Sequence, residues 1–89
     1  MPERTAVIGS SVGLHARPAT LFVQAVVGTG LPVTIAKEGG SAVDARSVLT
    51  VMSLGAKGGE TVVLSADGDD ADARLGELAA LLERDLDAE

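Results

Sequence analysis

The spacing of apolar side chains along the chain predicts short strands that alternate with amphipathic helices. Alternating or β-branched runs predict four strands, which we place at Arg4–Ile8, Val33–Lys37, Ala42–Asp44 and Glu60–Ala66. Apolar residues at helical spacing predict helices from the region of Pro18 to Gly28, from Ser47 to Leu54, and from about Asp70 to Arg84. The two longer helices are each expected to bury one stripe, formed by Ala19, Phe22, Val23 and Val26 and by Ala71, Leu75, Leu78 and Leu82.

This order of elements, βαββαβα, predicts an α+β fold. Two βαβ units and a terminal helix predict a four-stranded antiparallel sheet with three helices on one face, so the other face stays partly exposed. Glycines within Glu38–Ser41 accept the positive φ of a hairpin turn between the second and third strands. A chain of 89 residues is expected to form one domain, over residues 1–89, that is too small for a large enclosed cavity.

The composition removes several kinds of chemistry. The chain has no cysteine and one histidine, which excludes disulfides, thiolate nucleophiles and metal cages built from several histidines. The net charge of −6 lies in residues 67–89, which carry nine acidic and two basic residues, whereas residues 1–66 are nearly neutral. With no basic stripe and Phe22 as its one aromatic residue, the chain is not expected to bind nucleic acid. It has no apolar run of about 20 residues, so we expect a cytoplasmic protein that does not enter a membrane. We also expect it to be a monomer.

One segment, Gly13–Ala19, combines the residues that phosphate chemistry needs. Pro18 favours the first turn of a helix, which places His15 at or just before the N-cap. Imidazole lacks the side-chain oxygen of an ordinary cap, so we expect the N–H groups of Ala16 and Arg17 to receive an anion such as phosphate. The guanidinium of Arg17 adds a second set of donors to phosphate oxygens.

Beside a bound phosphate, the lone pair of neutral imidazole is a nucleophile toward phosphorus. The product is a phosphoramidate, which keeps a high transfer potential because nitrogen leaves readily once it is protonated. Helix amides and Arg17 stabilise the charge of the phosphoryl group, so no metal or other cofactor is expected. From these residues alone, a histidine that only interrupts the start of a helix stays open as the alternative.

The segment Gly13-Leu14-His15-Ala16-Arg17-Pro18-Ala19 resembles the active-site signature of the histidine-containing phosphocarrier (HPr) family of the bacterial phosphoenolpyruvate-dependent sugar phosphotransferase system. The resemblance covers nearly the whole chain in length and element order. It implies an open-faced β-sandwich and a stoichiometric carrier rather than a turnover enzyme. It also implies that His15 accepts phosphate on Nδ1 from phosphorylated enzyme I and hands it to enzyme IIA of sugar permeases, with Arg17 steadying the phosphoryl group.

A second segment, Ser47–Gly55, resembles the regulatory-serine segment of the same family. Ser47 is well suited to cap the short helix, and that role is expected whatever else holds. The resemblance implies that an HPr kinase/phosphorylase modifies this serine in some bacteria, and that a transcriptional regulator is then a partner. Added phosphate would put negative charge at a helix N-terminus, beside an apolar surface that docks partners.

That partner surface is expected to include Val48, Leu49, Met52 and Lys57. Spacing does not sort the apolar members between core and surface, and most are expected in the core. Methionine suits a surface that binds several partners, and Lys57 is expected at its rim, in a loop without the spacing of a phosphate-binding loop.

Three other functions compete with sugar-linked phosphotransfer. A regulatory binding module switched at Ser47 is disfavoured by the presence of His15. A phosphocarrier of a parallel, nitrogen-related branch is not separated from the first hypothesis by the residues. A small histidine phosphatase is disfavoured because no second acid or base accompanies His15.

Overall fold

The computed structural model describes residues 2–9, 13–14 and 16–84. The elements follow the predicted order: β1 (Glu3–Val7), α1 (Ala16–Thr29), β2 (Thr34–Lys37), β3 (Val43–Asp44), α2 (Val48–Ser53), β4 (Thr61–Ser65) and α3 (Ala71–Glu83). Every predicted strand and helix is present, and the ends differ by only a residue or two where the prediction gave them.

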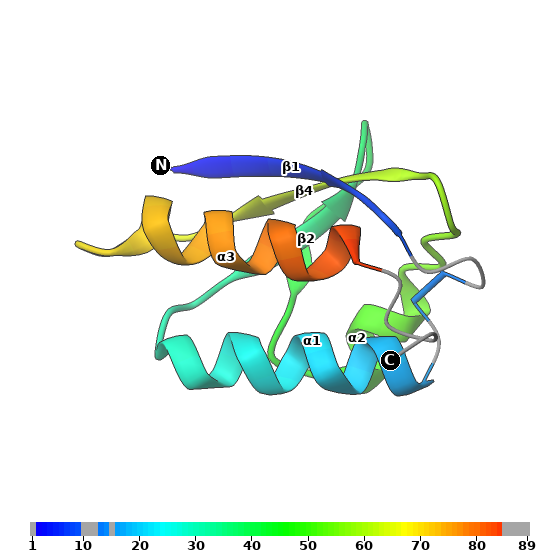
Figure 1. Cartoon of the computed structure of the whole chain (residues 1–89), viewed down its shortest axis with the longest axis horizontal. Helices are drawn as coiled ribbons and strands as arrows, with labels where there is room; N and C mark the ends of the chain where they lie inside the picture. The colour runs from blue at the N-terminus through cyan, green and yellow to red at the C-terminus, as the bar shows by residue number, and fades with distance from the viewer. Residues whose placement is uncertain (1, 10–12, 15, 85–89) are drawn as a thin grey trace.

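The four strands form one antiparallel sheet in the order β1-β4-β2-β3 (Figure 1). β4 lies between β1 and β2, so the last strand in the sequence joins the two βαβ units. Its Ser65 is the Cα partner of Glu3 on one side and of Thr34 on the other. The predicted antiparallel sheet is therefore confirmed, with the strand from the second unit at its centre.

The core lies between the sheet and the three helices. Alternate side chains of the strands, Ala6, Val62, Leu64 and Ile35 among them, are buried against the helices. Both predicted helical stripes are buried in full, and Pro18 and Ala79 join them. The opposite face of the sheet stays open, as Val7 shows with 46% of its surface exposed. No helix within the described part of the chain is long and apolar enough to cross a membrane.

The chain that leaves β1 is held tightly against the end of α3. Ile8, predicted as part of the strand, follows it instead, but it is buried and its N–H donates to the carbonyl of Glu60 at 2.9 Å. The N–H of Gly9 donates to the carbonyl of Leu82 at 2.9 Å, and a Cβ on Gly9 would lie 2.1 Å from the carbonyl oxygen of Glu83. Only glycine fits at this crossing, whereas the sequence suggested no more than a strand end.

A surface ion pair links the other end of β1 to α3. Arg4 Nε lies 3.3 Å from Asp72 Oδ1, and both side chains are exposed. The guanidinium lies over Gly76 in the middle of α3, where an added Cβ would be 3.6 Å from its nearest atoms. That distance is ordinary van der Waals contact, so nothing in the packing requires glycine there.

Candidate functional site

The predicted phosphate-binding segment leads directly into α1. The helix begins at Ala16, and Pro18 lies in its first turn with its ring buried, as the sequence predicts. Ala16 and Arg17 are exposed. The N–H groups of a first helical turn point out of the helix, where its dipole is positive, so this turn faces an incoming anion with favourable charge. His15 itself lies outside the described residues.

Just before α1, the chain rests on the loop that follows α2. The N–H of Leu14 donates to the carbonyl of Ala56 at 3.0 Å, and both side chains are buried. Gly13 has a φ of +79°, and a Cβ there would lie 2.4 Å from the Ala56 oxygen and 2.9 Å from the Cα of Lys57. The absence of a Cβ at Gly13 therefore lets this backbone approach the loop closely.

The loop is held in turn by Glu60. The N–H of Lys57 donates to Glu60 Oε1 at 2.8 Å, and the N–H of Glu60 donates to the carbonyl of Lys57 at 3.0 Å. The second carboxylate oxygen lies 3.3 Å from the Nζ of Lys37. The hydrogen bond from the backbone of Lys57, with help from the Lys37 ammonium, holds the pKa of Glu60 below its usual value.

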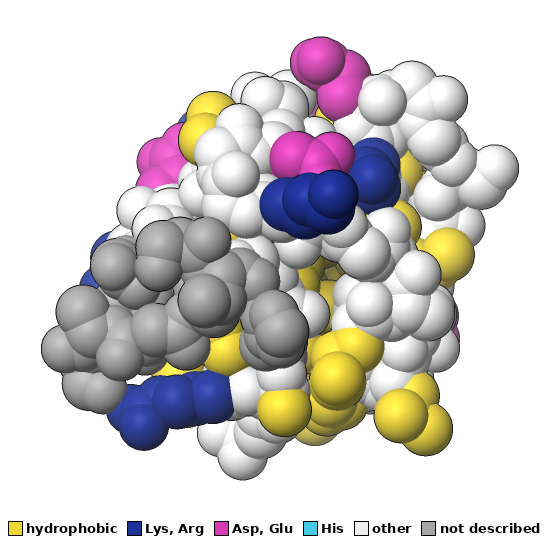
Figure 2. All heavy atoms as spheres, turned by 90° about the vertical axis from the view of Figure 1, so that its right-hand side faces the viewer, with side chains coloured by type: hydrophobic (Ala, Val, Ile, Leu, Met, Phe, Trp, Pro, Cys, Tyr) yellow, Lys and Arg dark blue, Asp and Glu magenta, His cyan; other side chains and the backbone are white. Residues whose placement is uncertain are grey.

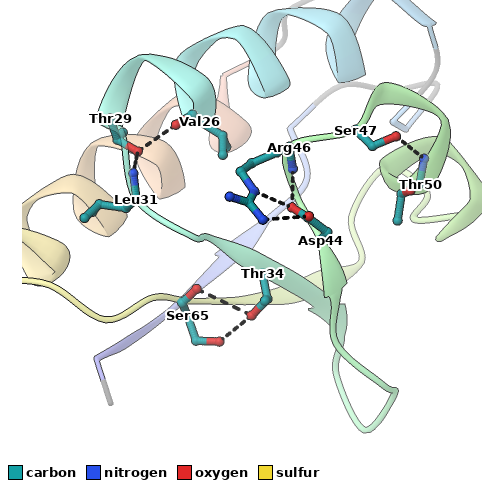
Figure 3. Close-up of polar contacts among 9 residues, drawn as sticks. All are labelled: Val26, Thr29, Leu31, Thr34, Asp44, Arg46, Ser47, Thr50 and Ser65. Atoms are coloured by element: carbon teal, nitrogen blue, oxygen red, sulfur yellow. Dashed lines mark hydrogen bonds and ion pairs between the residues drawn. The ribbon is translucent and has the colours of Figure 1, made fainter.

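Ser47 caps α2 as predicted. Its Oγ accepts a hydrogen bond from the N–H of Thr50 at 3.4 Å, and its backbone is extended (Figure 3). Asp44 lies in the turn before Ser47. Its Oδ1 accepts hydrogen bonds from the backbone N–H of Arg46 at 2.9 Å and from the guanidinium of Arg46 at 3.0 Å. These hydrogen bonds lower the pKa of Asp44 and raise that of Arg46. The turn before Ser47 is therefore closed by its own ion pair.

The face that carries the start of α1, α2 and the loop after it is shown in Figure 2. Hydrophobic side chains gather in the lower part of this view, and basic side chains lie above and below the grey region. Leu49 is 79% exposed and Met52 is 37% exposed, and Lys57 is also exposed. Val48, expected on the same surface, is partly buried against the core, because with Val51 and Leu54 it forms the inner side of α2.

This arrangement offers anion-binding groups beside an apolar surface. Among residues 2–9, 13–14 and 16–84, no three histidine, cysteine, aspartate or glutamate side chains lie close enough together to hold a metal ion. Asp72, near the start of α3, forms an ion pair with Arg4. The described groups at the start of α1 that could face an anion are the backbone N–H groups of its first turn and the exposed Arg17.

Comparison with known proteins identifies the family. The model of the PTS HPr component phosphorylation site matches residues 2–84. The phosphocarrier protein HPr of Streptomyces coelicolor is 52% identical over 87 residues, which are 98% of this chain and 94% of that protein. The HPr-like protein Crh of Halalkalibacterium halodurans is 34% identical over 85 residues, 96% of this chain and 100% of that protein.

A solved structure agrees with these matches. The crystal structure of HPr-C-His from Thermoanaerobacter tengcongensis is 39% identical, with a TM-score of 0.87 over 100% of this chain and 99% of that one. Fold and sequence together define a phosphocarrier of the phosphotransferase system. The chain belongs to the HPr family, in which phosphohistidine serves sugar transport and whose members interact with other components of that system.

Two residues with structural roles, one at this site and one at the end of α3, were missed at the level of sequence. Glu60 was counted as the first residue of a strand, yet its carboxylate organises the loop 57–60. The pair Gly58-Gly59 followed by an acid was the available signal, because an acid at the end of a glycine turn can reach back to the N–H that opens it. The second missed residue is Gly9, because no local sequence pattern indicates that the chain crosses the end of α3 at this position.

Proposed function

We propose that this chain carries a phosphoryl group on His15 between two partner proteins, as one phosphocarrier domain over residues 1–89. It accepts the group from phosphorylated enzyme I, which draws it from phosphoenolpyruvate, and passes it to enzyme IIA of sugar permeases. The observation that carries the proposal is the membership of the HPr family, together with a helix that begins directly after this histidine. The protein acts in the cytoplasm as a monomer and is consumed and regenerated stoichiometrically.

The chemistry is a displacement at phosphorus. The Nδ1 lone pair of His15 forms a P–N bond while the P–N bond to the donor histidine breaks and its electron pair returns to the donor imidazole. Onward transfer reverses these roles with enzyme IIA as acceptor. Transfer of this kind depends mainly on positioning and charge stabilisation, which the first turn of α1 and Arg17 supply.

Partner docking uses the exposed apolar side chains of α2. Leu49 and Met52 lie on a helix that packs against α1, so a protein that covers them also reaches the start of α1. Lys57 adds a positive charge on the same side, suited to acidic partners. Val48, which is partly buried, supports this surface from within.

The direct test is labelling with radioactive phosphoenolpyruvate and enzyme I. The chain should take up one phosphate, stable in alkali and labile in acid, as a phosphoramidate is. His15→Ala should abolish the label, and this variant contains no histidine at all. Arg17→Ala should slow labelling without removing it. An acid-stable label that survives the His15 substitution would contradict the proposal.

A second, regulatory function is supported by Ser47. Its position as the cap of α2, beside the exposed apolar residues, means that a phosphate there changes the charge of the docking surface. Incubation of the His15→Ala chain with ATP and an HPr kinase/phosphorylase should label Ser47 alone. A label that persists in the double variant with Ser47→Ala would assign the modification elsewhere.

A further inference from the structure

The peptide unit between Ala56 and Lys57 links a carboxylate to the segment that precedes the proposed acceptor. Its carbonyl, from Ala56, accepts the N–H of Leu14 at 3.0 Å. Its N–H, from Lys57, donates to Glu60 Oε1 at 2.8 Å. Glu60, one peptide unit and Leu14 therefore form a continuous chain of hydrogen bonds, which ends one residue before His15.

The geometry of this chain leaves the peptide unit little freedom. A peptide bond is planar, so the direction of its N–H fixes the direction of its carbonyl. The N–H of Glu60 also donates a hydrogen bond to the carbonyl of Lys57, so both backbone polar groups of Lys57 are bound to the same residue. The absence of a Cβ at Gly13 lets the two backbones approach, and a side chain there would collide with the Ala56 oxygen.

Electrostatics act in the same direction. An acceptor on the N–H side polarises the peptide and strengthens its carbonyl oxygen as an acceptor for Leu14, and an amide oxygen in the place of the carboxylate oxygen acts in the same way. The lowered pKa of Glu60 agrees with a carboxylate that is ionised while it accepts this hydrogen bond. Lys37 contacts the other carboxylate oxygen, Oε2, at 3.3 Å.

We infer that Glu60 is a positioning residue for phosphoryl transfer: it orients the Ala56–Lys57 peptide, on which Gly13 and Leu14 are held in front of α1. The inference rests on the function proposed above, since it concerns how the backbone that leads to His15 is held. Glu60 acts through the length of its side chain, which brings an oxygen to the N–H of Lys57, and through the direction of that hydrogen bond. A neutral acceptor of the same length therefore preserves its role, and a shorter charged one does not.

Three substitutions at Glu60 separate these properties. Glu60→Ala removes the acceptor and should slow phosphorylation by enzyme I about tenfold, because small displacements of reacting groups have effects of this order or larger. Glu60→Asp keeps the charge but shortens the side chain, and should behave like the alanine variant. Glu60→Gln keeps an oxygen at the same distance and should stay within about twofold of the unmodified protein.

The structural readout is hydrogen exchange at the N–H of Leu14, followed by NMR in the full chain without partners. Glu60→Ala and Glu60→Asp should speed this exchange, and Glu60→Gln should restore protection. Two matched controls remove a surface ion pair without touching the peptide: Lys37→Met breaks the pair with Glu60, and Glu77→Ala breaks the pair with Arg74, 2.9 Å long on α3. Both should leave the Leu14 exchange and the labelling rate unchanged.

The outcomes separate this inference from the function on which it rests. An unmodified chain that takes no label from enzyme I overturns both. A labelled chain in which Glu60→Ala and Glu60→Asp react at the normal rate overturns the positioning role alone, whatever happens to Leu14 exchange. A glutamine variant as slow as the alanine variant, or a slow Lys37→Met variant, assigns the effect to charge and also overturns it. Should Glu60→Ala fail to fold, the comparison of Glu60→Asp with Glu60→Gln decides.

Discussion

Gly76 occupies the middle of α3, where glycine is among the least favourable residues because it loses the most backbone freedom on folding. Its φ does not fall among the positive values of the described glycines, and an added Cβ would meet Arg4 at 3.6–3.7 Å. Gly76→Ala therefore adds a methyl group in ordinary contact with a flexible, exposed side chain. We expect it to raise the free energy of unfolding by about 1 kcal/mol. For a protein of this size, that corresponds to a rise in Tm of roughly 4–8 °C.

Urea and thermal unfolding followed by circular dichroism measure this gain. Gly28→Ala is a useful comparison, because a Cβ there meets nothing within 4 Å and the residue lies in the last turn of α1, so its gain should be smaller. Combining Gly76→Ala with Arg4→Ala tests the contact. A gain that appears only when Arg4 is absent would show that the guanidinium does not accommodate the methyl group. No gain in either background would contradict the propensity argument itself.

Four further outcomes are expected. Gly13→Ala should lower the free energy of unfolding by about 2 kcal/mol or more in urea titrations, because it forces a left-handed φ and a clash on the Ala56 carbonyl. Because folding lowers the pKa of Glu60, its ionised carboxylate stabilises the fold above the ordinary glutamate pKa of 4.5, and this stabilisation is lost as pH falls through the lower pKa of the folded state. The free energy of unfolding, measured by urea titration across this pH range, should therefore depend less on pH in Glu60→Gln than in the unmodified protein. Ser47→Ala should cost about 0.5–1 kcal/mol in thermal unfolding, at the low end for a cap because the hydrogen bond is 3.4 Å long. Leu49→Ala should change stability by less than about 0.5 kcal/mol but weaken binding to enzyme I in calorimetric titration, because the side chain is mostly exposed.

Local pattern was sufficient for most of the fold. The stripe containing Phe22 in α1 and the stripe containing Leu75 in α3 each repeat at helical spacing, so the buried faces of both helices could be predicted from the order of residues alone. Ser47 and the glycine that follows Leu54 marked the short helix in the same way. Strand pairing was predicted only as a type, antiparallel, because the central place of β4 depends on contacts between distant segments.

The close backbone contacts at the candidate site and at the end of α3 could not be predicted from local pattern for the same reason. The approach of Gly13 to Ala56 and that of Gly9 to Glu83 each join backbones far apart in the sequence, and neither leaves a periodic signal. The division of α2 between core and surface also needed the structure. Val48 lies partly inward and Leu49 outward, and only the packing of α2 beside α1 distinguishes them.

The hydrogen bond between Leu14 and Ala56 has a consequence for how the protein acquires its activity. It connects a segment near the start of the chain to one that follows α2, so it forms only after most of the chain has been synthesised and has folded. A nascent or partly unfolded chain contains the motif but not its support, and should be a poor phosphate acceptor. Only the folded protein would then accept phosphate at a normal rate. Partner proteins would exchange phosphate with folded copies and not with unfolded ones.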